Sequence, residues 1–140
     1  MTTVMVIEDS LAQRELISHI INRGGWKVTK FSDGIEALRS LNSQLPDLIL
    51  LDVVMPRMNG YEVCRRLKKN QTTKNIPIIL CSSKGHQSDR YWAMKQGADA
   101  YLVKPFHPIE LLKTVKINLE RASNPKLASV MNGLSYCQTA

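Results

Sequence analysis

The sequence lacks long hydrophobic runs and paired cysteines, and each shortage excludes a class of protein. Its apolar runs are brief, as at Leu48–Leu51, whereas about 20 apolar residues are needed to cross a bilayer. The stretch before Glu8 is too short for the hydrophobic core of a secretion signal. The 3 cysteines include no C-x-x-C pair, which argues against a disulfide framework and against a cysteine-bound zinc. We therefore expect a reduced, cytoplasmic protein with no membrane insertion.

What the sequence does contain is an ordinary globular composition with unevenly placed charge. The 140 residues are 44% hydrophobic, and a chain of this length typically forms one domain. Lys and Arg outnumber Asp and Glu by 19 to 12, which gives a formal net charge of +7. Residues 1–52 hold 7 acids and 5 bases, whereas residues 53–140 hold 5 acids and 14 bases. The function has to account for acids that gather early and bases that gather late.

Short apolar runs recur along the chain and alternate with segments of helical spacing. Runs such as Val4–Ile7 are continuous, as expected of strands buried on both faces of a parallel sheet. Ser10 followed by Gln13 predicts a capped helix start, and Pro108 suits the first turn of a last helix. The predicted strands are 4–7, 26–28, 48–51, 78–81 and 100–103, with a helix predicted after each.

Five strands that alternate with five helices predict an α/β fold, a doubly wound five-stranded parallel sheet with helices on both faces. We expect one domain over residues 1–121. The chain becomes more polar after Arg121, so residues 122–140 are predicted to be a C-terminal tail. A short extra helix from Lys126 to about Met131 and a frayed end are the two alternatives for this tail.

Polar residues stand where the predicted strands end, and ligands of such sheets bind beyond these carboxyl ends. Glu8 and Asp9 follow the first strand, and Asp52, Ser82 and Lys104 follow the third, fourth and fifth. Clustered carboxylates are costly unless a cation offsets them, and Mg²⁺ is bound by carboxylates, carbonyls and water. Beside such an ion, Asp52 can attack phosphorus, and Ser82 and Lys104 can contact the phosphoryl oxygens. The sequence therefore predicts a site that forms an aspartyl phosphate with Mg²⁺, or with Mn²⁺ as an alternative.

Taken together, these motifs resemble the receiver domain of two-component response regulators over about residues 3–121. The resemblance implies a flavodoxin-like receiver fold with strand order 2-1-3-4-5. It also implies a phosphoryl group donated by a histidine kinase. The matching segments are 6–10, 52–56 with Gly60, 78–83, 97–99 and 101–106.

The resemblance also assigns roles by position. Asp52 matches the phospho-acceptor, and Lys104 matches the lysine that contacts the phosphoryl group and precedes a cis proline. Glu8 and Asp9 match the acidic metal-binding pair, and the backbone carbonyl of Val54 matches a further metal ligand.

Two further positions match the family's switch. Ser82 corresponds to the hydroxyl residue and Tyr101 to the aromatic residue on the fifth strand. The resemblance implies that phosphorylation draws Ser82 inward and that Tyr101 follows. The surface formed by the helix before strand 100–103 (helix 4), that strand (strand 5) and the last helix (helix 5) then changes its affinity for a partner. Val54 and Ser83 match positions that set the rate of dephosphorylation. Because a valine side chain cannot orient an attacking water, we expect a persistent phosphoryl group.

The predicted function is therefore that of a response regulator and not of an ordinary enzyme, with at most self-phosphorylation and slow self-dephosphorylation. The sequence resembles single-domain regulators of chemotaxis, twitching motility or phototaxis. We expect a monomer or weak dimer that acts on a downstream motility or signalling protein. A phosphate sink for a paired kinase is one alternative. An aspartate-nucleophile phosphatase is another, but such enzymes usually have a second Asp where this chain has Val54. A phosphorylation-independent adaptor is a third, although adaptors generally lack one or more of the site residues.

The basic residues raise the question of nucleic-acid binding. The residues given after the receiver region contain no recognisable helix-turn-helix, so we expect solvated helix faces or an acidic protein partner to account for the charge. Tyr91 and Trp92 fall in the fourth predicted helix, where an exposed Trp can anchor a partner. Packing of that Trp against the sheet or the tail is the alternative. The bases around helices 3, 4 and 5 include Arg57, Arg65, Arg66, Lys68, Lys69, Lys74, Lys84, Arg90, Lys95, Lys113, Lys116, Arg121 and Lys126.

Overall fold

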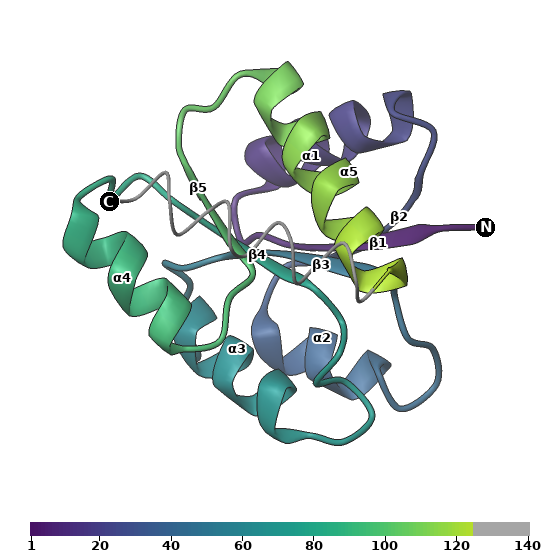
Figure 1. Ribbon diagram of the computed structural model, residues 1–140, viewed down its shortest axis with the longest axis horizontal. Helices are drawn as coiled ribbons and strands as arrows, with labels where there is room; N and C mark the ends of the chain where they lie inside the picture. Colours follow the sequence, from purple (N-terminus) through teal and green to yellow (C-terminus); the bar gives the residue numbers. More distant parts are fainter. Residues whose placement is uncertain (125–140) are drawn as a thin grey trace.

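The computed structural model describes residues 1–124, and in it a parallel sheet lies between two layers of helices (Figure 1). The strands are β1 (Thr3–Ile7), β2 (Lys27–Phe31), β3 (Leu48–Asp52), β4 (Ile78–Ser82) and β5 (Ala100–Val103). The helices are α1 (Leu11–Arg23), α2 (Gly34–Ser40), α3 (Gly60–Lys69), α4 (Gln87–Lys95) and α5 (Pro108–Ser123). The strand order is β2-β1-β3-β4-β5, which confirms the predicted fold and topology.

The two faces of the sheet make two separate hydrophobic cores. Alternate residues of β1 show the division, because successive side chains of a strand point to opposite faces. Met5 and Ile7 pack in the cluster that includes residues of α2, α3 and α4. Val4 and Val6 pack in the cluster that includes residues of α1 and α5. Figure 1 shows the same division, with α1 and α5 above the sheet and the other three helices below it.

The central strands were located well because β1, β3 and β4 are buried along their whole length. The second strand was placed wrongly at 26–28, since β2 runs over Lys27–Phe31. This strand is at the edge of the sheet, where its two lysines are exposed and its other three residues are half-buried. An edge strand needs no continuous apolar run, and so its sequence gives a weaker signal.

The helix starts follow local capping chemistry. The Oγ of Ser10 accepts a hydrogen bond from the backbone N–H of Gln13, as the sequence predicted. Asp33 caps α2 in the same manner through the N–H of Glu36. The last helix runs to Ser123, past the predicted end of the domain at residue 121. The tail helix predicted from Lys126 lies outside the described residues.

Candidate functional site

The centre of the site is the ammonium group of Lys104, which comes from the end of β5. Its Nζ donates hydrogen bonds to Glu8 Oε1 at 2.5 Å, to Gln13 Oε1 at 2.6 Å and to Asp52 Oδ1 at 2.8 Å. An ammonium group has three donors, so these three acceptors use all of them. The structure thus joins the carboxyl ends of β1, β3 and β5, as the fold predicts.

Three carboxylates gather around this lysine. Oxygen atoms of Glu8, Asp9 and Asp52 all lie within 4.8 Å of one another. Glu8 is 2% exposed and Asp52 is 8% exposed, whereas Asp9 is open to solvent. One ammonium group cannot neutralise three carboxylates, and an oxygen-rich, partly open set of this kind suits a hard divalent cation. The residues present therefore fit a magnesium ion.

Burial and charge shift the acid–base properties of the site. Burial raises the pKa of Glu8 above its ordinary 4.5, and the neighbouring Asp52 carboxylate raises it further, while the hydrogen bond from Lys104 opposes the rise. Burial alone would lower the pKa of Lys104, but its hydrogen bonds to Asp52 and Glu8 outweigh this effect and raise that pKa above 10.5. Lys104 therefore stays protonated at neutral pH and remains a fixed positive charge.

The backbone after β3 holds Asp52 in place through Gly60. The N–H of Gly60 donates to the carbonyl of Val53 at 2.8 Å. A Cβ at Gly60 would collide with the carbonyl oxygen of Asp52 and would lie 2.9 Å from the Cα of Val53. Only glycine lets the start of α3 approach the end of β3 this closely. The side chain of Val54, by contrast, is 58% exposed and lines the site pocket together with Asp9 and Ser83.

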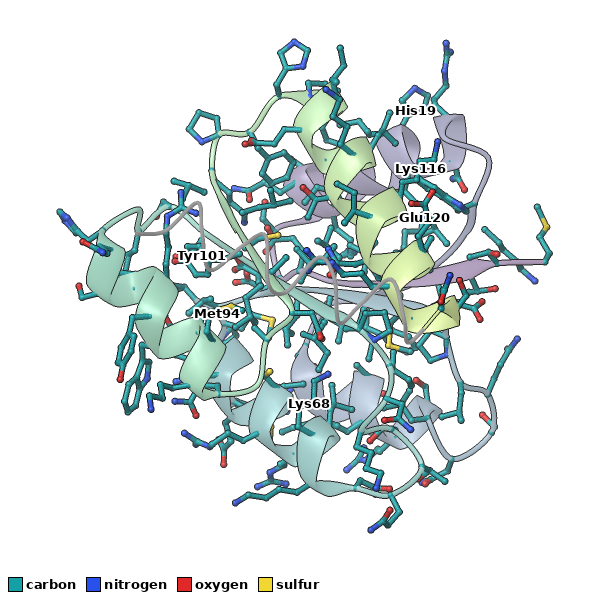
Figure 2. The ribbon with its side chains drawn as sticks, viewed as in Figure 1. His19, Lys68, Met94, Tyr101, Lys116 and Glu120 are labelled. Carbon is teal, nitrogen blue, oxygen red and sulfur yellow. The ribbon has the colours of Figure 1, made fainter. Side chains whose placement is uncertain are left out.

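The two predicted switch residues lie at the same end of the sheet. Ser82 is 1% exposed, and its Oγ accepts a hydrogen bond from the N–H of Lys84 at 3.2 Å. Tyr101 is 9% exposed. Its hydroxyl donates to the carbonyl of Lys84 at 2.6 Å, so both residues bond the same β4–α4 loop. Figure 2 labels Tyr101 beside α4.

Sequence reasoning missed one side chain of this site. Gln13 was predicted only as the partner of Ser10 in a helix cap, but its side chain bonds Lys104 instead. The signal was present, because a residue in the first turn of α1 faces the carboxyl end of β1. The distance between the two residues along the chain hid the connection. The Lys104–Pro105 peptide bond is cis, as the resemblance implied.

Comparison with known proteins identifies the family. Residues 4–116 match the response regulator receiver domain. The chain belongs to this family. Receiver domains accept phosphoryl groups, bind Mg²⁺ at an acidic pocket and work with histidine kinases, and the carboxylate cluster of this receiver domain corresponds to that pocket.

The curated relatives agree on the family, and the two described here are transcriptional regulatory proteins. The receiver domain is 33% identical over 139 residues to the phosphate regulon transcriptional regulatory protein PhoB of Escherichia coli, covering 98% of this chain and 61% of PhoB. It is 35% identical over 119 residues to the alkaline phosphatase synthesis transcriptional regulatory protein PhoP of Bacillus subtilis, covering 85% of this chain and 49% of PhoP. The chain thus spans about half to three fifths of the length of these curated relatives.

Solved structures resemble the receiver domain over most of its length. The chemotaxis response regulator CheY4 of Vibrio cholerae superposes with a TM-score of 0.79 at 32% identity, over 84% of this chain and 98% of that one. The receiver domain of a signal transduction histidine kinase from Syntrophus aciditrophicus superposes with a TM-score of 0.80 at 35% identity, over 86% of this chain and 91% of that one. Among the described residues, no helix combines the length and the apolar composition needed to span a bilayer.

Proposed function

We propose that this receiver domain accepts a phosphoryl group on Asp52 from a histidine kinase and thereby switches a protein-binding surface. The observation that carries the proposal is the shared lysine: Lys104 bonds Asp52 at 2.8 Å and Glu8 at 2.5 Å, and Asp9 completes the acidic group. In the transfer, the bond between phosphorus and the kinase nitrogen breaks while a bond from an Asp52 carboxylate oxygen to phosphorus forms.

The chain's own groups have distinct parts in this transfer. The Oδ1 of Asp52 is hydrogen-bonded to Lys104, which leaves the other carboxylate oxygen for attack on phosphorus. Lys104 supplies a fixed positive charge for the phosphoryl oxygens. Glu8, Asp9, Asp52 and the backbone carbonyl of Val54 would hold the magnesium ion. When bound, that ion offsets the negative charge that builds up on the transferred group.

The switch would start from the β4–α4 loop. The Oγ of Ser82 now accepts from the N–H of Lys84, and the Tyr101 hydroxyl bonds the carbonyl of the same residue. A phosphoryl group on Asp52 offers Ser82 stronger acceptors, so the serine turns toward it and the loop loses one of its two restraints. The position of Tyr101 and the shape of the α4–β5–α5 surface then change together.

Incubation with Mg²⁺ and acetyl phosphate tests the acceptor assignment. Intact-mass spectrometry should show addition of one acid-labile phosphoryl group to the wild-type chain and none to Asp52→Asn. Chelation of the metal should block the reaction in wild type. Continued modification of Asp52→Asn would overturn the assignment, and a circular dichroism spectrum identical to wild type would show that the variant is folded.

The rival function, an aspartate-nucleophile phosphatase, needs a general acid next to the nucleophile. The side chain at the usual place is Val54, which is 58% exposed and has no proton to give. We therefore expect no catalytic turnover of phosphate monoesters and a phosphoryl group that persists on Asp52. Release of many equivalents of phosphate from such a substrate would favour the phosphatase.

The pathway proposal is control of motility or taxis in the cytoplasm, with a phosphate-sink role as the alternative. It is supported by the likeness to a chemotaxis response regulator of which the match covers 98%. We propose a single domain with the predicted bounds 1–121, extended by the end of α5 to Ser123, and a monomer or weak dimer. A phosphotransfer profile against the histidine kinases of the same genome would identify the cognate kinase.

A further inference from the structure

Helix α4 presents large apolar side chains to solvent. Tyr91 is 61% exposed, and Trp92 and Met94 are each 51% exposed, whereas the buried residue of the helix is the small Ala93. Met94 is labelled on α4 in Figure 2. Contiguous apolar side chains that stay exposed in a folded domain are typical of a binding surface, and here Tyr91 and Trp92 are the adjacent pair.

The geometry of α4 shows which way Trp92 faces. Arg90 faces β5, because its guanidinium carbon lies 5.7 Å from the centroid of the Tyr101 ring. Trp92 follows two positions later and is turned by about 200° around the helix axis, to the opposite flank of the buried stripe. Gln96 lies one turn after Trp92 and accepts a 3.0 Å hydrogen bond from Arg65 of α3. Trp92 therefore lies at the boundary between α3 and α4, away from Tyr101.

The surroundings of Trp92 are basic. We define the Trp92 face as Arg65 and Lys69 of α3 together with Tyr91, Trp92 and Lys95 of α4, all of which are exposed. In the described chain, no carboxylate lies within 4.0 Å of the three bases of this face. Arg65 bonds a neutral amide, and Lys95 lies 5.4 Å from the centroid of the Tyr91 ring.

The other bases of α3 are already matched with acids. Arg66 pairs with Glu62 at 3.3 Å, and Lys68 pairs with Asp99 at 2.9 Å. The unmatched charge of this helix is thus concentrated on the Trp92 face, and is not an even coating of the surface.

We infer that the Trp92 face binds an acidic protein segment that carries an apolar anchor, and that it does so whether or not Asp52 is phosphorylated. Trp and Arg are the residues most often found at the energetic centre of protein interfaces, and carboxylates supply the complementary charge. The face lies on the flank of α4 opposite Tyr101, so it does not depend on the proposed switch. The Trp92 flank of α4 would then bind a partner in both phosphorylation states, while the flank that faces Tyr101 changes on phosphorylation.

Two other occupants fit the face less well. A second copy of the chain would set the same unpaired bases against each other, and like charges disfavour such a contact. A single-stranded nucleic acid binds where several aromatic rings are free for base stacking. Here Lys95 already lies over the Tyr91 ring, which leaves only the Trp92 ring on this face.

The test uses the full chain and a labelled helical peptide of about four turns, with Leu along one stripe and Glu at the remaining positions. A matched peptide has Gln in place of Glu, and oligothymidylate serves as the nucleic-acid probe. Fluorescence anisotropy should show that the Glu peptide binds about tenfold more tightly than the Gln peptide and than the oligonucleotide. Asp52→Asn and the phosphorylated chain should bind the Glu peptide as wild type does.

Variants locate the binding. Trp92→Ala and Lys69→Glu should each weaken Glu-peptide binding by about tenfold. Ile109→Ala removes another exposed apolar side chain, and Lys116→Glu makes the same charge change on α5, so both should bind like wild type. Equal losses in these variants and their controls, or equal affinity for the Glu and Gln peptides, would overturn the proposal. Tighter binding of the oligonucleotide would overturn it in favour of nucleic acid, and dimerisation lost in Trp92→Ala would do so in favour of a second copy.

Discussion

The Nζ of Lys104 lies 2.6 Å from the Oε1 of Gln13, a residue 91 positions earlier in the chain. The bond occupies the one donor of the ammonium group that the carboxylates of Glu8 and Asp52 leave over. To contact a phosphoryl group, Lys104 has to give up one of these three bonds. Gln13 holds the only neutral acceptor among them, so its bond is the easiest to break.

Replacement of Gln13 should therefore change the rate of phosphorylation. Gln13→Ala frees one donor of Lys104, and we expect phosphorylation by acetyl phosphate to become about threefold faster, with a loss of stability of about 1 kcal/mol or less. Gln13→Glu adds a carboxylate that repels the phosphoryl group and should slow the reaction. Time-resolved intact-mass spectrometry measures both rates. His19→Ala, an exposed change on the same helix, is the control, and equal rates in all these chains would contradict the prediction.

Replacement of Glu8 by Gln should raise the stability of the metal-free chain and at the same time remove its stabilisation by Mg²⁺. The folded-state pKa of Glu8 is raised, so between 4.5 and that higher pKa the folded chain binds more protons than the unfolded chain. The metal-free chain therefore loses stability as the pH rises through this range. Glu8→Gln carries no such charge, so without metal it should be more stable than wild type at pH 7 and should show a flatter pH profile.

Chemical denaturation in a chelator at several pH values measures this difference. Addition of Mg²⁺ should then stabilise wild type but not Glu8→Gln, because the variant has lost one carboxylate ligand. Stabilisation of both chains by Mg²⁺ would show that Glu8 is not a ligand.

A methyl group at Gly60 should disturb the acceptor without touching its side chain. Gly60→Ala forces a Cβ against the carbonyl oxygen of Asp52, and because the obstacle is backbone it cannot turn aside. We expect a loss of about 1–3 kcal/mol of stability and a large fall in phosphorylation rate. Gly25→Ala is the matched control, since a Cβ there meets nothing within 4 Å and the only cost is its φ of +95°. Thermal unfolding measures the loss of stability, and the phosphorylation assay measures the transfer rate. A normal transfer rate in Gly60→Ala would contradict the prediction.

Asp33, which caps α2, should make the folded chain less stable as the pH falls into the acid range. The Oδ1 of Asp33 accepts from the N–H of Glu36 at 2.9 Å, and its Oδ2 accepts from Arg57 at 2.5 Å. The hydrogen bond from Glu36 and the charge of Arg57 hold the pKa of Asp33 below its usual 3.8. Its stabilising effect is therefore complete above pH 3.8 and is lost as the pH falls through the lower folded-state pKa.

Asp33→Ala should accordingly cost about 1 kcal/mol at pH 7 and less in acid. Asp33→Asn keeps a capping oxygen and should cost less than Asp33→Ala at neutral pH. Urea unfolding across the acid range measures the difference, and a cost that does not change with pH would exclude the carboxylate as its source.

The sequence by itself predicted the α/β class and the polar residues at the strand ends, and its resemblance to receiver domains implied the strand order. Continuous apolar runs such as Leu48–Leu51 identify strands buried on both faces, and a parallel sheet then brings the residues after those strands to one edge. Asp52 and Lys104 could be expected to meet for that reason alone. The edge strand β2 was misplaced by its sequence because half of its surface is solvated and imposes no apolar pattern.

Only the tertiary structure decided which partners the long side chains choose. Gln13 had a plausible local role in a helix cap, yet its side chain bonds Lys104, because folding puts a charged donor within its reach. Trp92 had equally plausible buried and exposed positions, and the rotation of α4 against Tyr101 and Arg65 turns it away from the sheet and leaves it 51% exposed. Its predicted alternative of packing against the tail lies outside the described residues. Local sequence describes how a helix or strand starts and which face is apolar. The rotation of a packed helix about its own axis depends on contacts between residues far apart in the chain. These contacts exist only after the chain has folded.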